Sequence, residues 1–88
     1  MRLFTEKTMR ILTLLKHKDS VDYEVLRKAK LVNNKVSYYI LVSHLRDLGL
    51  IEEVNSRVRK KDWKLTKRGR EFAEVFEAVL KVYDKYYK

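Results

Sequence analysis

The sequence contains no cysteine and no proline, and only two of its 88 residues are glycine. Without cysteine, a disulfide framework and a site built on thiolate ligands are excluded. Two histidines, His17 and His44, are too few for an ordinary zinc site, so we expect no metal and no cofactor. No apolar run approaches the roughly 20 residues that a membrane-spanning helix needs, and the N-terminus lacks a signal-peptide pattern. We therefore expect no membrane partner and a cytoplasmic location.

The length and the charge indicate one small basic domain. A chain of 88 residues is one domain's worth and buries only a modest core, so additional stability from a partner subunit is plausible. The formal net charge is +9, which favours polyanionic partners, with nucleic acid first and an anionic membrane surface second. A basic surface that serves only solubility is the alternative. The richness in Lys, Glu and Tyr is typical of proteins from hot environments.

One stretch, residues 33–51, organises the rest of the chain. Asn34 is suited to cap the start of a helix, and Gly49 is suited to the left-handed conformation that closes one. The apolar residues between them recur at three- and four-residue steps and predict a buried helix face, formed by Tyr38, Leu41, Val42, Leu45 and Leu48. The opposite face carries Val36, Tyr39, Ile40, Ser43 and Asp47. A helix with one buried face and a polar, aromatic leading end suits a DNA groove.

The flanking segments predict two earlier helices and a later hairpin. Helical periodicity covers residues 5–17 and 22–30, and two helices joined by a short turn are typical of a helix-turn-helix unit. In the second helix, Tyr23, Leu26 and Ala29 should face inward. Residues 50–54 and 61–65 read as strands, and the basic connection between them makes a β-hairpin "wing". The predicted fold is mainly α with a small β-hairpin (α+β), in the order α-α-α-β-β-α.

The last helix, which Thr66 should cap, carries an apolar stripe too wide for one domain to cover. Its central residues step by four, three, four and three, which predicts a short heptad seam of Phe72, Phe76, Val79, Tyr83 and Tyr86. Part of the stripe should pack on the chain's own domain and part on a second copy. We therefore expect a DNA-binding domain over residues 1–66 and a dimerisation helix over residues 67–88, packed on the same domain.

Two motifs carry a resemblance to a known family. Residues 45–51, LRDLGLI, are followed by residues 63–72, WKLTKRGREF, at a separation that leaves room for the β-hairpin wing. This pair resembles the signature shared by MarR-type and PadR-type winged helix-turn-helix regulators. It is most similar to small archaeal winged-helix proteins that dimerise through a C-terminal coiled coil, and it covers the chain from about Ile11 to Tyr86. The resemblance implies duplex DNA as partner, bound by a homodimer in the role of regulator or chromatin component.

The candidate contact residues fall into three groups. The groove-facing group on the central helix is Asn33, Asn34, Lys35, Ser37, Tyr39, Ile40 and Ser43, with Ile40 or Val36 suited to a thymine methyl group. A plain helix cap is an equal alternative for Asn34, and partial burial is one for Tyr39. The wing supplies Arg57, Arg59, Lys60 and Lys61, and the second helix extends the basic surface with Arg27, Lys28 and Lys30.

We predict a transcriptional regulator that binds DNA as a homodimer in association with the nucleoid. A non-specific chromatin protein is the close alternative. A second alternative is a winged-helix protein-interaction module, because Val36 and Ile40 stand where polar base-reading residues are common. The sequence shows no phosphate loop and no paired nucleophile and base, so we do not expect an enzyme. The sequence indicates no small-molecule effector.

Overall fold

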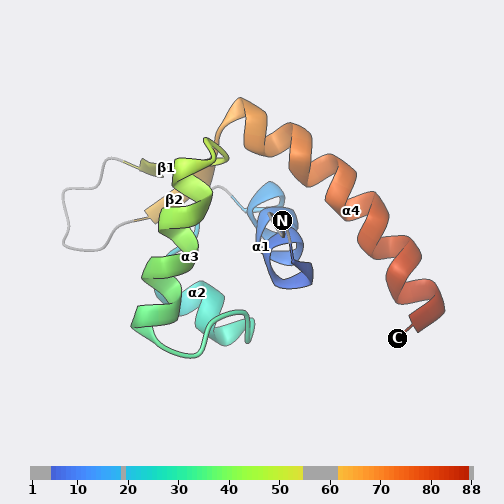
Figure 1. Ribbon diagram of the computed structural model, residues 1–88, viewed down its shortest axis with the longest axis horizontal. Helices are drawn as coiled ribbons and strands as arrows, with labels where there is room; N and C mark the ends of the chain where they lie inside the picture. The colour runs from blue at the N-terminus through green and yellow to red at the C-terminus, as the bar shows by residue number, and fades with distance from the viewer. Residues whose placement is uncertain (1–4, 19, 55–61, 88) are drawn as a thin grey trace.

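The computed structural model describes residues 5–18, 20–54 and 62–87, which form four helices and one antiparallel strand pair at the edge of the helices (Figure 1). The elements in chain order are α1 (Glu6–Lys16), α2 (Tyr23–Lys28), α3 (Lys35–Asp47), β1 (Ile51–Val54), β2 (Asp62–Leu65) and α4 (Lys67–Tyr87). The predicted mainly α fold with a small hairpin, and its order of elements, are confirmed. None of the described helices is long and apolar enough to cross a membrane.

Each of the first three helices begins at a side-chain cap. Thr5, Asp22 and Asn34 have extended backbones, and their side-chain oxygens accept hydrogen bonds from the N–H groups three residues later. These bonds satisfy backbone donors that the first turn of a helix leaves without partners. The cap predicted at Asn34 is confirmed, and Thr5, the first residue expected in the first helix, is the cap of α1. Asp22, predicted as the first residue of the second helix, is its cap, so α2 begins one residue later than expected.

The ends of α2 and α3 use the same backbone motif with different residues. At the end of α3, Gly49 has a φ of 77°, and the Leu50 N–H donates to the Leu45 carbonyl at 3.0 Å. At the end of α2, Lys30 takes the corresponding position with a φ of 61°. A left-handed backbone is unfavourable for residues with a Cβ, which is why the sequence predicted only the stop at Gly49. Consequently α2 ends at Lys28 and not at Lys30 as expected.

The hairpin pairs β1 with β2 from Ile51 opposite Leu65 to Val54 opposite Asp62. The first strand was predicted to begin at Leu50, but the Leu50 N–H closes α3 instead. Val21 extends the sheet through two backbone hydrogen bonds with Trp63, of 2.9 and 2.8 Å, an isolated bridge that the sequence did not indicate. The connection at residues 55–61 lies outside the described residues.

The core joins the inner faces of all four helices to the hairpin. Its most deeply buried side chains are Ile11, Leu12, Leu15, Leu26, Leu45 and Leu50. The predicted inner face of α3 is confirmed for Tyr38, Val42 and Leu45, which are buried, while Leu41 and Leu48 are partly buried. Ala29 was predicted to face inward but is exposed, because it caps the end of α2 and the chain turns outward there.

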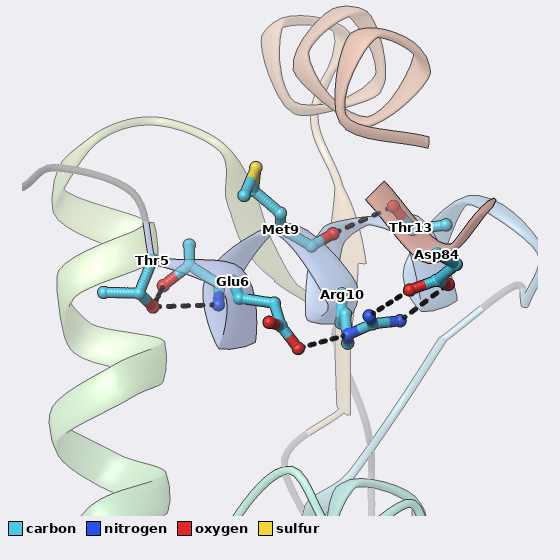
Figure 2. A network of polar contacts seen from close by, with 7 residues as sticks. Thr5, Glu6, Met9, Arg10, Thr13 and Asp84 are labelled. Atoms are coloured by element: carbon cyan, nitrogen blue, oxygen red, sulfur yellow. Dashed lines mark hydrogen bonds and ion pairs between the residues drawn. The ribbon is translucent and has the colours of Figure 1, made fainter. Parts of the chain in front are cut away.

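Helix α4 lies along α1, on the side of the molecule opposite to α3 (Figure 1). Figure 2 shows Arg10 of α1 between Glu6 and Asp84, with its Nη2 2.8 Å from the Asp84 Oδ1. The hydrogen bond with Asp84, and to a smaller extent the one with Glu6, raises the pKa of Arg10 above its already high value. Nearly two helical turns away, Lys16 Nζ donates to Glu77 at 2.8 Å, and His17 contacts the same carboxylate. Lys16 and His17 lower the pKa of Glu77 to about 2.

The two motifs of the sequence resemblance meet where α3 ends and α4 begins. The Thr66 hydroxyl donates to the Gly49 carbonyl at 2.6 Å and accepts from the Gly69 N–H at 3.0 Å, so it links the two segments and caps α4 as predicted. A Cβ on Gly69 would lie 1.9 Å from the Leu50 carbonyl oxygen, closer than any side chain allows. Glycine at this position therefore permits the contact that joins the motifs.

Candidate nucleic-acid interface

Tyr38 fixes the orientation of α3 from its inner face. Its ring packs edge-on against Tyr23 of α2, with the ring centroids 5.4 Å apart. The indole Nε1 of Trp63 in β2 donates to the Tyr38 hydroxyl oxygen at 3.0 Å. Burial raises the pKa of Tyr38 to about 12, and the hydrogen bond from Trp63 acts in the opposite direction. The phenol thus stays neutral at physiological pH, and α3 is held between α2 and the hairpin.

This anchoring turns the opposite face of α3 to solvent. Val36 is 68% exposed, Tyr39 56% and Ile40 67%. Of the seven residues predicted to face the groove, all are exposed except Ser43, which is partly buried. Tyr39 contacts the edge of the Tyr38 ring, with centroids 5.3 Å apart, but remains largely accessible. The structure therefore brings the predicted set together on one accessible surface.

The first turn of α3 is suited to an anion. The Asn34 side chain accepts from the Ser37 N–H at 2.8 Å, so Asn34 has the capping role that was its alternative. The first turn contains no acidic residue, and Lys35 adds a positive charge to the positive end of the helix dipole. The acidic residue of this helix, Asp47, lies at its far end. Negative charge is thus confined to the end of α3 that lies farthest from the cap.

The cations predicted on the second helix are exposed, but they are not equivalent. Lys28 lies in the last turn of α2, and Lys30 lies in the turn that leads to α3. Arg27 makes an ion pair with Glu24 at 2.9 Å, which raises the pKa of Arg27 and offsets part of its charge. Lys28 and Lys30 therefore contribute more strongly than Arg27 to the positive charge of the segment that precedes α3.

The wing residues Arg57, Arg59, Lys60 and Lys61 lie outside the described residues. Their predicted contact with DNA therefore stays a prediction. The described part of the hairpin carries a cross-strand ion pair, Lys64 with Glu52, at 3.4 Å on its exposed side. Trp63 is buried on the opposite side.

Helix α4 carries two apolar stripes, whereas the sequence predicted one wide stripe. The buried stripe is Gly69, Ala73, Phe76 and Leu80, and the exposed one is Val75, Val79, Val82 and Tyr86. Both step by four, three and four residues, and an offset of six residues turns them apart by about 120°. Phe76, predicted to lie at a dimer interface, is instead 9% exposed in the chain's own core.

The remaining residues of the predicted seam lie on accessible surface. Val79 and Tyr86 belong to the exposed stripe, whereas Phe72 and Tyr83 lie between the two stripes and are 37% and 41% exposed. Val75 and Val82 are 59% exposed and were missed as interface candidates, although their spacing from Val79 was visible in the sequence. The exposed stripe is therefore available to a partner, in a register different from the predicted one.

Comparisons with known proteins give a fold but no sequence family. No protein-family model matches the chain, and no curated protein sequence does. Among solved structures, F-93 of SSV1 is similar, with 19% identity, a TM-score of 0.69 and coverage of 97% of this chain and 96% of the other. A variant of Lactococcus lactis ZitR is similar with 20% identity and a TM-score of 0.71, over 93% of this chain and 59% of that one.

A third similar structure is that of a PadR-like transcription factor from Bacteroides fragilis. It has 27% identity and a TM-score of 0.63, over 91% of this chain and 82% of the other. The three likenesses each extend over nearly the whole chain, and they agree with the order of helices and hairpin described above. The chain has the winged helix-turn-helix fold.

Proposed function

We propose that the protein binds duplex DNA as a homodimer, with α3 in the major groove, and regulates transcription at the nucleoid. The observation that carries this proposal is the surface of α3: an accessible first half without acidic residues, beside exposed lysines, on a helix anchored from behind by Tyr38. The similarity to a PadR-like transcription factor supports the same reading.

The charges favour the sugar–phosphate backbone as the first contact. Lys35 begins α3, Lys28 and Lys30 are exposed in the segment that precedes it, and the net charge of the chain is +9. Each phosphate that a lysine neutralises releases counterions, so affinity should fall steeply as salt rises. Asn33 is exposed before the helix cap and can donate to a phosphate. In this proposal the wing residues after Ser56 contact the flanking backbone or the minor groove.

The exposed stripe of α4 supports the dimer. Val75, Val79, Val82 and Tyr86 repeat at the spacing with which two helices interlock, on a helix of 21 residues. An accessible apolar row of this length is unfavourable in water, and a second copy of α4 would cover it. The two α3 helices of the dimer would then contact sites about 34 Å apart, or a multiple of that distance.

Titration of labelled duplexes at several salt concentrations tests the proposal. The variant Lys28→Gln/Lys35→Gln should bind at least roughly tenfold more weakly than the wild type. It should reduce the slope of log affinity against log salt by about 2 per protomer, which is about 4 for the dimer. The matched control, Lys81→Gln/Lys85→Gln on α4, removes the same charge from another part of the surface and should have a much smaller effect. Absence of wild-type binding at low salt, or an equal loss in the control, would contradict the proposal.

Two other functions remain to be separated by the same titrations. A chromatin protein would lose all sequences alike as salt rises, whereas a regulator keeps a preferred site. A protein-interaction module would use the exposed side chains of Val36, Tyr39 and Ile40 and would not bind DNA. Selection of preferred duplexes from a random pool distinguishes the first two, because only a regulator enriches a common sequence.

A further inference from the structure

We infer that α3 distinguishes bases chiefly by the C5-methyl group of thymine, which Val36 and Ile40 contact in the major groove. This inference rests on the proposed function, since it requires α3 to lie in that groove. It adds which feature of the DNA is read and which side chains read it.

The geometry places these two side chains at the centre of the outward face. Val36 and Ile40 are one helical turn apart and point away from the buried Tyr38 and Val42. With exposures of 68% and 67%, they are the most accessible apolar side chains of α3. Side chains at the centre of the outward face of a groove-bound helix are the ones that approach the bases most closely.

The chemistry of the two side chains leaves one kind of base contact. Neither Val36 nor Ile40 can donate or accept a hydrogen bond, so neither can pair with the polar groups that distinguish guanine, cytosine and adenine. The one apolar group that a standard base pair presents in the major groove is the C5-methyl of thymine. The outward residues between Lys35 and Ser43 include no Asn, Gln or Arg, the side chains that make bidentate base contacts.

The spacing predicts the arrangement of the thymines. Four residues of α-helix rise about 6 Å, which is close to the length of two base-pair steps of about 3.4 Å each. If α3 lies along the groove, Val36 and Ile40 would contact methyl groups about two base pairs apart. The two half-sites of a dimer would each contain such a pair.

The surroundings of the patch favour DNA over an apolar protein surface. Even with Tyr39, the three exposed apolar residues of this face are far fewer than the roughly 20–30 residues that each partner contributes to a stable protein interface. The patch is bordered by Lys35, Ser37 and Ser43, and Lys28 and Lys30 lie beyond its leading end. A ring of cations and hydroxyls complements phosphates and base edges, with the apolar pair in the middle to meet a methyl group.

Replacement of thymine by deoxyuridine tests the inference, because it removes the methyl group and keeps every hydrogen-bonding group. We would compare a 24-base-pair duplex of alternating adenine and thymine (a length of about two DNA turns) with the same duplex containing deoxyuridine. The wild type should bind the deoxyuridine duplex at least about fivefold more weakly, as expected when buried methyl contacts are lost. The variant Val36→Ala/Ile40→Ala should bind both duplexes equally, about as weakly as the wild type binds the deoxyuridine one.

A control variant and a fold control make the comparison specific. Ser43→Ala alters the same face without removing an apolar contact. Whatever it does to the affinity for both duplexes, it should keep the wild-type ratio of affinities between the thymine and the deoxyuridine duplex. Because Val36 and Ile40 are exposed, the alanine variant should keep the wild-type circular dichroism spectrum and melting temperature. The wild-type comparison needs no variant at all, so the inference can fail even if a variant is unstable.

The outcomes separate this inference from the proposed function. Equal wild-type binding to the two duplexes would overturn the methyl contact and leave DNA binding intact. A preference for thymine that persists in Val36→Ala/Ile40→Ala would also overturn it, because the methyl groups would then act through DNA shape. No wild-type binding to either duplex at low salt would overturn the proposed function, and this inference with it.

Discussion

The outer faces of α3 and α4 are both apolar and accessible, yet they differ in length and in charge. On α3, Val36 and Ile40 form a two-residue patch beside exposed lysines. On α4, Val75, Val79, Val82 and Tyr86 form a continuous row that reaches the last turn of the helix. The two helices lie on opposite sides of the molecule (Figure 1). Each is therefore free to bind a partner without blocking the other.

The difference shows that exposure of apolar side chains does not by itself identify a partner. A long apolar row at heptad spacing suits another helix, because the side chains of the same row on a second copy can pack into the spaces between its own side chains. A short patch among cations matches a polyanion that presents a few methyl groups. The proposed division of work, self-association by α4 and DNA recognition by α3, follows from these matches. Three predictions test it, from the largest effect to the smallest.

The first prediction concerns the outer face of α4. Val75→Glu/Val82→Glu places two charges in the exposed stripe, so the dimer should dissociate to monomers. Binding to a duplex with two half-sites should then weaken by about 100-fold or more, because the second contact is no longer linked to the first. Sedimentation equilibrium and fluorescence anisotropy measure the two effects.

The control for this prediction changes the net charge by the same amount outside the stripe. Ala78→Glu/Lys85→Gln alters α4 on a neighbouring face and should remain dimeric with nearly unchanged affinity. A dimer that survives Val75→Glu/Val82→Glu would remove α4 as the site of association. The outer face of α4 would then have no role in self-association to set it apart from the outer face of α3.

The second prediction concerns the close contact between Gly69 and Leu50, where the end of α3 meets the start of α4. Gly69→Ala forces a methyl group against the Leu50 carbonyl, and we expect the free energy of unfolding to fall by about 3 kcal/mol. Gly49→Ala is the matched control. Its Cβ would meet only the mobile end of Arg68 at 3.0 Å, so strain of the left-handed backbone, about 1 kcal/mol, should dominate. Urea denaturation measures both, and a larger loss for Gly49→Ala would contradict this account.

The third prediction concerns the inner side of α4, where Glu77 contacts Lys16 and His17. The lowered pKa of Glu77 means that its stabilising effect is complete above the unfolded value of 4.5 and is lost as the pH falls toward 2. Glu77→Gln should lower the melting temperature at pH 7 by about 2–5 °C and should remove part of the dependence on pH below 4.5. Melting curves between pH 2 and pH 7 measure this.

The control for the acid titration is Glu74→Gln, an exposed carboxylate one turn earlier on α4. It should leave both the melting temperature at pH 7 and the acid dependence nearly unchanged. If Glu74→Gln and Glu77→Gln behave alike, the contact of Glu77 with α1 contributes nothing specific. The inner side of α4 would then be held by apolar packing and by the ion pair between Arg10 and Asp84.

Local features of the fold could be predicted from the sequence because their causes are local. Asn34 and Gly49 mark the two ends of α3. The side chain of asparagine can cap the start of a helix, and glycine can take the left-handed backbone that ends one. The buried positions Tyr38, Val42 and Leu45 follow from a period that any observer of the sequence can count. The turn at Lys30 could not be predicted, because its left-handed backbone is unfavourable for a lysine. The bridge at Val21 could not be predicted either, because it depends on where β2 lies.

The candidate site divides in the same way. The exposure of Val36, Tyr39 and Ile40 was predictable, because it is the complement of the buried period. The hydrogen bond from Trp63 to Tyr38, which orients that surface, joins residues 25 positions apart and was not predictable. The positions of the wing arginines remain a prediction from sequence.

The sequence by itself determined which residues of this protein are apolar, basic or helix-bounding, and hence that α3 and α4 would each have a buried side. Only the tertiary structure decided which side of the wide stripe on α4 is buried, because that depends on where α1 lies. Phe76 belongs to the core and Val75 to the surface for this reason alone. A helical period gives the angle between residues on one helix, whereas the direction of the core is set by the elements packed against it.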